Sequence, residues 1–285
     1  MKNKYPYPTV ILLFTIVTLL TLLPACYQRQ AFYVSPFNGN TGNYQTIPLR
    51  ADSIRAATYA SAVFETGSAN ENGKDYFNAF NTSLSRSHNL GVLQAYYGLD
   101  LTLGSYITGI WGEGPTPNGS PFGPNNPTPN HQLLNQYAGN HFFGGAGFNG
   151  GMNLSAQFYK REWRYLGFET SLNHEFGRYL QLRQVIPDSA ADLIIRNNFF
   201  GTIGITSEFL GQTRTGQFGF KWAGGWVLGP DYNNLGFHDN ESGAPLRYHY
   251  FNFTFHYSWS AYTSYIQLNS ATKATGLHIG FNYRL

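Results

Sequence analysis

Seven ionisable residues stand on the polar side of segments in which polar and apolar side chains alternate. They are Asp100, Glu169, Glu175, Glu208, Lys221, His256 and Arg284. The structural interpretation is a network in which acids pair with bases and hold a narrow interior rigid. The chemical alternative is a proton-active or ligand-binding pocket, because carboxylates, histidine and lysine are common proton-transfer groups. Both interpretations require paired or hydrated charges, since an isolated charge at membrane depth is costly.

Other groupings of chemically active residues carry less information. His131, His141, His174 and His249 have no metal-binding spacing. Cys26 is the only cysteine, which excludes an intramolecular disulfide and a multi-cysteine zinc site. The chain has no His-Glu-x-x-His and no Gly-x-Ser-x-Gly. The glycine-rich segment 144–147 lacks the strand-then-helix setting of a nucleotide loop, so close backbone approach or strand curvature is the interpretation. We expect no metal and no cofactor.

Composition narrows the class of protein. Charged residues make up 12% of the chain and aromatic residues 17%, whereas soluble domains are roughly 25% charged. No stretch after residue 25 approaches the roughly 18 consecutive apolar residues of a membrane helix. The formal net charge is only +3, and Lys2 and Lys4 supply two of those charges, so nothing favours nucleic acid as a partner. Two fold classes remain as candidates: a soluble all-β sandwich and a closed membrane barrel.

The alternation of apolar and polar residues predicts ten β-strands. We expect them at about 54–66, 75–87, 93–103, 142–158, 166–175, 199–209, 217–222, 251–259, 262–268 and 275–285. Polar and glycine-rich inner faces, aromatic residues near strand ends and spans near the required length of roughly 9–11 residues favour the membrane barrel over the sandwich. Eight strands remain an alternative if the first two, or 251–259 and 262–268, are misdivided.

The connections between these strands differ in length in a regular way. Short connections are expected at about 88–90, 159–161, 211–215 and 260–261, and long ones at 106–139, 177–196 and 229–246. Short periplasmic turns that alternate with long external loops are typical of membrane barrels, and an even strand number leaves both termini on the periplasmic side. The short connections 67–73 and 269–274 weaken this indication without reversing it.

The last strand adds a specific signal. Its apolar face ends in Phe281, Tyr283 and Leu285, which resemble the C-terminal assembly signal of outer-membrane barrels, although Leu replaces the usual terminal Phe. On this resemblance, residues 53–285 are similar to a small outer-membrane β-barrel protein of Gram-negative bacteria. The resemblance implies an all-β, antiparallel transmembrane barrel located in the cell outer membrane. Its implied partners are outer-membrane lipid and the barrel-assembly machinery.

The N-terminal region is expected to lie outside the barrel. Lys2 and Lys4 precede an apolar stretch over 10–23, as in a secretory signal peptide, so residues 1–25 are predicted to be removed. Leu23-Pro24-Ala25-Cys26 resembles a lipobox, which makes Cys26 the candidate lipidated residue; ordinary cleavage nearby is the alternative. Residues 26–52 have no strong period and are interpreted as a periplasmic tether, with a short plug in the lumen as the alternative.

The function expected from these patterns is non-enzymatic. It is a structural role, or binding of an extracellular ligand through the loops at 106–139, 177–196 and 229–246. A narrow small-solute channel is the alternative, although side chains are expected to fill so narrow a barrel. A third hypothesis is a hydrolase at the external rim. Outer-membrane proteases of ten-strand form use acids and histidine there, and this site would need Asp231, His238 and Asp239 to converge within hydrogen-bond reach.

Overall fold

The chain forms a closed β-barrel in a computed structural model that describes residues 32–38, 42–52, 54–68, 75–110, 131–191, 193–229, 249–271 and 274–285. The barrel strands are β2 (Ala56–Ser68), β3 (Tyr76–Leu90), β4 (Leu93–Thr108), β5 (Gly139–Phe158), β6 (Arg161–Gly177), β8 (Phe199–Gln212), β9 (Gln217–Leu228), β10 (His249–Trp259), β11 (Tyr262–Ala271) and β12 (Ala274–Arg284). All barrel pairs are antiparallel, and β12 pairs with β2 to close the sheet. The predicted fold class and strand number are confirmed.

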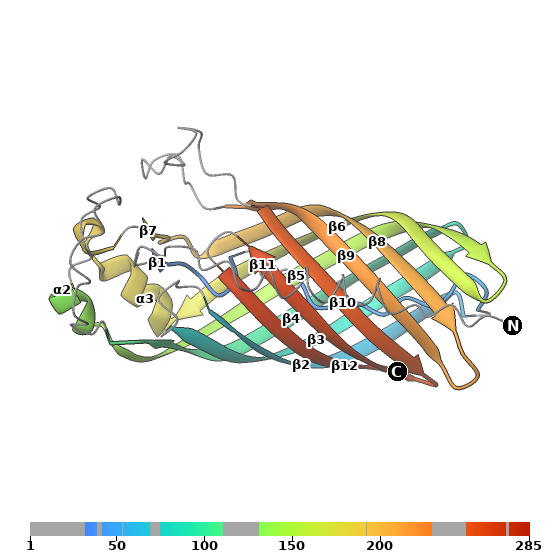
Figure 1. Ribbon diagram of the computed structural model, residues 1–285, viewed down its shortest axis with the longest axis horizontal. Helices are drawn as coiled ribbons and strands as arrows, with labels where there is room; N and C mark the ends of the chain where they lie inside the picture. Colours follow the sequence, from blue (N-terminus) through green and yellow to red (C-terminus); the bar gives the residue numbers. More distant parts are fainter. Residues whose placement is uncertain are drawn as a thin grey trace, which may run out of the picture.

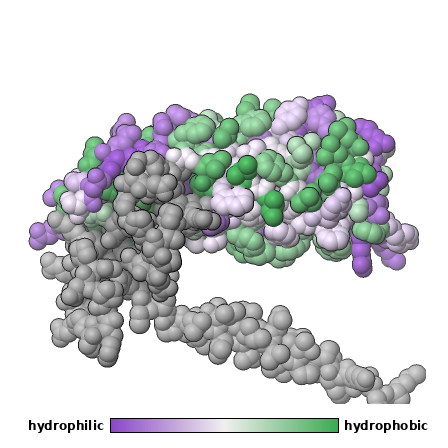
Figure 2. Space-filling view, turned by 90° about the horizontal axis from the view of Figure 1, so that it is seen from above, coloured by the Kyte–Doolittle hydropathy of each residue, from purple (hydrophilic) through white to green (hydrophobic). Residues whose placement is uncertain are grey.

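The wall of the barrel separates an apolar exterior from a polar interior. Successive side chains of a strand point to opposite faces, and Leu99, Phe255 and Ile279 on the outer face are 66%, 58% and 51% exposed. Inward residues such as Asn81 and Thr254 are buried. Figure 2 shows apolar residues along the side of the barrel and many strongly hydrophilic residues toward its ends. This is the face assignment predicted from the alternation.

A β-bulge in β6 changes which residues point inward. The pairing of β6 with β8 shifts register between Arg164 and Gly167. Tyr165 and Leu166 are consecutive, yet both are exposed on the outer face, while Arg164 and Gly167 point inward. A bulge inserts one extra residue into a strand and re-aims the side chains on either side of it. The inward positions are therefore even-numbered before the bulge and odd-numbered after it.

The two ends of the barrel differ (Figure 1). The turn end carries the short connections 91–92, 159–160, 213–216 and 260–261, where Gly91 adopts a φ of 87° in the tight turn. The cap end carries α2 (His131–Asn135), α3 (Arg178–Val185), the short 3₁₀ helix η1 (Asp188–Ala190) and β7 (Leu193–Ile194). Among the described residues, no helix has the length and apolarity needed to cross a membrane.

The region predicted to be a tether lies largely inside the barrel instead. We call described residues 32–38 and 42–52 the lumen segment. It begins at the cap end with β1 (Phe32–Tyr33), which pairs in parallel with β7, and it is buried at nearly every position up to Leu49. The tether interpretation of 26–52 is therefore wrong for these residues, because they are buried in the lumen and several of their polar groups hydrogen-bond to the inner wall. The plug alternative is correct, while residues 1–31, with Cys26, lie outside the described part.

Candidate functional site: the plugged lumen

Arg164 fastens the lumen segment near the turn end. Its Nη1 lies 2.5 Å from Glu208 Oε2 and its Nε lies 3.2 Å from Glu162 Oε1, with all three side chains buried. Its Nη2 reaches the lumen segment, where it donates to the carbonyl oxygen of Ile47 at 2.9 Å. A planar guanidinium with five donors suits such a site. One buried cation thus pairs with two wall carboxylates and also binds the plug backbone.

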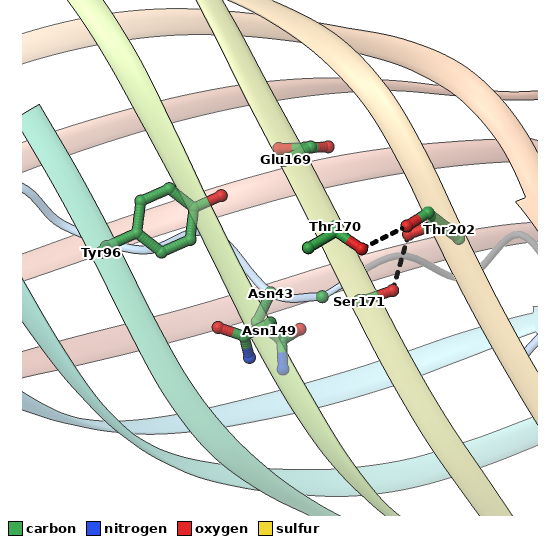
Figure 3. A pocket seen from close by; sticks show the side chains of 8 residues that line it. Asn43, Tyr96, Asn149, Glu169, Thr170, Ser171 and Thr202 are labelled. Carbon is green, nitrogen blue, oxygen red and sulfur yellow. Dashed lines mark hydrogen bonds between the residues drawn. The ribbon is translucent and has the colours of Figure 1, made fainter.

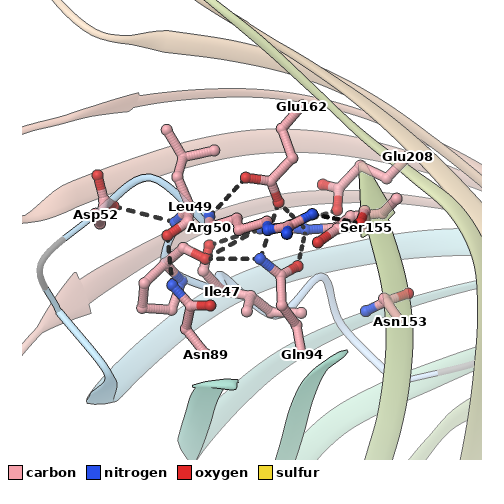
Figure 4. Close-up of polar contacts among 12 residues, drawn as sticks. Ile47, Leu49, Arg50, Asp52, Asn89, Gln94, Asn153, Ser155, Glu162 and Glu208 are labelled. Atoms are coloured by element: carbon pink, nitrogen blue, oxygen red, sulfur yellow. Dashed lines mark hydrogen bonds and ion pairs between the residues drawn. The ribbon is translucent and has the colours of Figure 1, made fainter. Parts of the chain in front are cut away.

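The main chain of the lumen segment is held by the same group of wall residues (Figure 4). The backbone N–H of Arg50 donates to Glu162 Oε2 at 2.6 Å, and Asn89 Nδ2 donates to the carbonyl oxygen of Leu49 at 2.6 Å. Gln94 joins the group by donating to Glu162 Oε1 at 2.9 Å while its own Oε1 accepts from Arg164. Buried backbone groups outside regular structure need such partners, so this stretch of plug depends on the wall.

Tyr44 reaches from the lumen segment to a second pair of wall residues. Its hydroxyl donates to Glu208 Oε1 at 2.7 Å and lies 3.0 Å from His256 Nε2. The Tyr44 and His256 rings stack with centroids 4.4 Å apart. His256 Nε2 lies 2.9 Å from the same Glu208 oxygen. A carboxylate, an imidazole and a phenol are groups that can transfer protons. Here the plug buries them and supplies the phenol itself, so their contacts favour the structural interpretation.

We expect Tyr44→Phe to lower the free energy of unfolding by about 1.5–3 kcal/mol, the usual cost of losing a hydrogen bond to a charged group. The ring stacking on His256 is kept, so the loss reports the hydroxyl. Denaturant unfolding of the refolded protein in detergent would measure it. Tyr159→Phe is the matched control, because Tyr159 is 90% exposed and should change stability by less than about 0.5 kcal/mol. Equal effects of the two changes would contradict the role of Tyr44.

A third group of polar residues lies at mid-height. Lys221 Nζ is 2.7 Å from Glu169 Oε2, and the Tyr250 hydroxyl donates to Glu169 Oε1 at 3.2 Å. Figure 3 shows Tyr96 and Asn149 of the wall beside Asn43 of the lumen segment. The cavity that these residues line with Glu169 measures ≈ 10 Å³, which is about the space that one water molecule needs. The lumen is filled at this level.

The cap end holds the start of the lumen segment. Ser35 Oγ donates to Glu175 Oε2 at 2.5 Å, and Arg183 of α3 forms an ion pair with the same carboxylate. The Tyr179 hydroxyl donates to the carbonyl oxygen of Val34 at 3.0 Å. Burial raises the pKa of this hydroxyl well above its ordinary value, so it remains a neutral donor. An apolar cluster surrounds these contacts and includes Phe32, Tyr33, Phe37, Phe143, Leu182, Ile186 and Leu193.

The glycines of β5 leave space on the wall, and at Gly145 that space is used by the plug. A side chain at Gly145 would place its Cβ 2.3 Å from the Phe37 ring of the lumen segment. At Gly147 a Cβ would lie 2.1 Å from Asn173 Oδ1 and 2.5 Å from Asp100 Oδ2. Cβ contacts this short essentially do not occur, so a side chain at Gly145 would displace the Phe37 ring, and one at Gly147 would displace Asn173 and Asp100. The predicted close backbone approach is therefore found, and for Gly145 the approaching group is the plug.

The seven predicted ionisable residues fall into separate places along the lumen. Glu208 and His256 share the Arg164 group, and Glu169 pairs with Lys221. Glu175 lies at the cap end, and Asp100 accepts from Asn149 Nδ2 at 3.1 Å. Arg284 lines an open cavity at the turn end with Asp52 and Tyr59. The inward placement agrees with the prediction, but the residues form several clusters rather than one network.

Several residues that bind the lumen segment most extensively were not among the seven ionisable residues predicted from the sequence. Arg164 and Glu162 have the parity of outward residues in the strand predicted at 166–175, and the bulge reverses it. Arg183 lies in the segment 177–196, which was interpreted as an external loop, yet it is fully buried under the cap. Tyr44 was placed in the tether. A buried arginine has no sequence signal of its own, although Glu162 close to Arg164 in a weakly charged chain was a usable hint.

Several predictions concern residues whose positions the structure does not describe or whose role it does not probe. The residues outside the described part include Cys26, the proline-rich stretch 111–130 of loop 106–139, and Asp231, His238 and Asp239. Phe281 and Tyr283 lie on the outer face of β12 and are 40% and 41% exposed, and Leu285, which follows the strand, is 69% exposed. Within the described ranges, no group of three His, Cys, Asp or Glu side chains could hold a metal ion.

Comparisons with known proteins find only distant structural similarity to other β-barrels. No family model matches the chain, and no curated protein matches it. The β domain of the Bordetella autotransporter BrkA aligns with 81% of this chain and 100% of its own, at 8% identity and a TM-score of 0.42. The translocator domain of NalP from Neisseria meningitidis aligns with 82% of this chain and 90% of its own, at 8% identity and a TM-score of 0.33. The KdgM porin aligns with 78% of this chain and 98% of its own, at 10% identity and a TM-score of 0.25.

Proposed function

We propose that this chain is an outer-membrane β-barrel protein whose lumen is sealed by its own N-terminal segment. Its role is structural, or it binds a partner through its external surface, and it is not an enzyme. The observation that carries the proposal is the lumen segment itself. Its described residues are mostly buried, and it is hydrogen-bonded to the wall at Ser35 near the cap end and at Arg50 near the turn end. Many buried polar contacts close the lumen of this barrel. A lumen closed in this way is suited neither to transport nor to catalysis.

The outer face supports insertion into a membrane. Leu99, Leu101 and Leu103 of β4 are consecutive outward residues, each at least 45% exposed. Large apolar surface of this extent on a soluble protein is unfavourable, whereas a lipid bilayer covers it. Barrel strands of 10 to 20 residues meet the roughly 9–11 that a tilted membrane strand needs. The longer connections of the cap end support our proposal that this end is external.

The cap end is the surface that we propose for binding. Of the three predicted loops, 177–196 folds back as α3, η1 and β7 and closes over the lumen segment through Tyr179 and Arg183. Segment 177–196 therefore helps to close the lumen. The loops 106–139 and 229–246 have most of their residues outside the described part, and they remain the candidates for contact with an extracellular ligand.

Two measurements on the refolded mature protein test this proposal together. A folded barrel in detergent should migrate faster on a gel without heating than after boiling. The same sample in a planar lipid bilayer should insert without opening steps of ionic current. A heat-insensitive, freely soluble protein would contradict membrane insertion. Regular current steps through the unmodified protein would contradict the sealed lumen.

We expect Leu99→Arg to destabilise the membrane-inserted barrel by about 2–4 kcal/mol, the cost of an arginine near the bilayer midplane on a lipid-facing strand. Leu99 lies near the middle of β4 and is 66% exposed. Val185→Arg is the matched control, because Val185 is 63% exposed at the end of α3, outside the barrel wall. Reversible unfolding in lipid vesicles measures both changes. Equal stabilities of the two variants would show that lipid does not face Leu99.

Lipidation of Cys26 is part of the proposal and has its own prediction. Cells supplied with radiolabelled palmitate should label the unmodified protein, and Cys26→Ala should abolish the label, since no other cysteine is present. The barrel of the variant should still show heat-dependent migration, because the lumen segment is unchanged. Absence of label from both forms would favour ordinary cleavage of the signal peptide near residue 25.

A further inference from the structure

We infer that the lumen segment enters the barrel from the external side, so that the mature N-terminus before Phe32 is displayed at the cell surface. This inference rests on the proposed function, which places the cap end outside. The cap end fixes the first residues of the segment. Phe32 and Tyr33 pair with Leu193 and Ile194 of β7, and the backbone N–H of Ile195 donates to the carbonyl oxygen of Tyr33 at 3.0 Å.

The contacts that follow progress steadily toward the other end. Asn43 Oδ1 lies 2.9 Å from His278 Nδ1, in the cap-side half of β12. Asn282 lies four residues closer to the turn end of β12, and its Nδ2 donates to Thr46 Oγ1 at 2.9 Å. Leu49 then contacts Asn89 beside the turn between β3 and β4. The direction of the segment through the lumen is therefore fixed by wall residues at each level.

The end of the segment connects directly to the barrel. The backbone N–H of Asn89 donates to the carbonyl oxygen of Arg55 at 2.7 Å, and β2 begins at Ala56. The chain thus runs from the cap end to the turn end inside the lumen and returns as β2 in the wall (Figure 1). Since β2 pairs with β12 in the finished barrel, the segment lies inside a closed wall.

Covalent geometry limits where a mature N-terminus at Cys26 can lie. Cys26 precedes Phe32 by six positions, and an extended chain spans at most about 3.6 Å per residue, or about 20 Å here. The apolar band of an outer-membrane barrel is about 25 Å tall. A chain that is seated at Phe32 on the external side cannot return Cys26 to the periplasm. If Cys26 carries acyl chains, they insert into the external leaflet beside the cap.

One peptide epitope inserted at three positions of the full-length protein tests the inference. The first insertion lies between Ala31 and Phe32, the second after Asn118 in loop 106–139, and the third after Arg214 in the turn between β8 and β9. Antibody binding is measured by flow cytometry before and after permeabilisation of the outer membrane. We expect the first two epitopes to bind antibody equally in intact cells, and the Arg214 epitope to bind only after permeabilisation.

The outcomes separate this inference from the proposed function. If the epitope before Phe32 behaves like the Arg214 epitope while the Asn118 epitope is accessible, the proposed orientation stands and external entry is wrong. If only the Arg214 epitope is accessible in intact cells, the orientation is reversed and both are wrong. Heat-dependent migration of each variant shows that its barrel has folded.

A cross-link tests the seating of the segment without an insertion. Neighbouring strands lie about 4.8 Å apart, within the range of about 4.4–6.8 Å between the α-carbons of a disulfide. Phe32→Cys with Leu193→Cys, in a Cys26→Ala background, should therefore form an internal disulfide in the cell envelope, visible as a gel shift lost on reduction. Phe32→Cys with Arg214→Cys should not. A folded barrel without the first disulfide, or with the second, would overturn the inference.

Discussion

Removal of residues 32–52 is expected to convert a closed barrel into one that conducts ions. The deletion takes away Tyr44, Ile47 and the backbone that Arg164 and Glu162 bind. The wall residues then face water, which can hydrate their charges, and the inner surface left behind is polar at every level from Glu175 to Glu162. Ten strands leave a narrow interior, so we expect small, steady current steps in planar bilayers in place of none.

The matched control for this deletion removes residues 111–130, a segment of similar length from a connection at the cap end. That variant keeps every described contact of the lumen segment and should remain closed. Heat-dependent migration must be retained by both variants, because a collapsed barrel would also fail to conduct. A folded barrel that lacks residues 32–52 and still blocks ions would contradict the interpretation of the lumen segment as the seal.

The barrel itself is predictable from the sequence because of one physical constraint. A lipid-facing wall requires an apolar side chain at every second residue of each strand, and the other positions face a polar interior. β10, with five aromatic residues on one parity, and the regular end of β12 carry this pattern directly. The number of strands and the two kinds of connection follow from counting such segments.

The plug is not predictable in the same way. An irregular segment has no period, and its polar residues Asn43, Tyr44 and Gln45 have the composition of a solvated linker. Whether they are hydrated or buried depends on partners far away in sequence, such as Glu208 and His278. The glycines of β5 were the available signal, since Gly145 leaves space that only a group inside the barrel can fill.

The candidate network was predicted in kind but not in arrangement. Strand parity locates inward charges such as Glu169 and Lys221 correctly, because it needs only the period of the strand. It fails at Arg164 and Glu162, where the bulge reverses the parity. Parity also gives no height along the barrel axis. The separation of Glu175 from Glu208 by most of the length of β6 follows from the register between strands, which the sequence alone does not supply.

We expect Arg164→Met to lower the free energy of unfolding by about 3–5 kcal/mol, the usual cost of removing one partner from a buried ion pair. Arg164 is fully buried between Glu162 and Glu208. Methionine is similar in length and apolar, so packing is largely kept while two carboxylates lose their cation. Denaturant unfolding of the barrel in lipid vesicles, followed by tryptophan fluorescence, measures the difference.

Arg196→Met is the matched control. Arg196 pairs with Asp188 at 2.6 Å, but these side chains are 33% and 77% exposed, and exposed pairs contribute at most about 1 kcal/mol. Adding Glu208→Gln to Arg164→Met should recover part of the loss, because one uncompensated charge is removed. Arg164 also binds the backbone at Ile47, so the single variant should admit ions more often than the unmodified protein. Loss of stability without any leak would show that the plug is held by its other contacts, chiefly at the cap end.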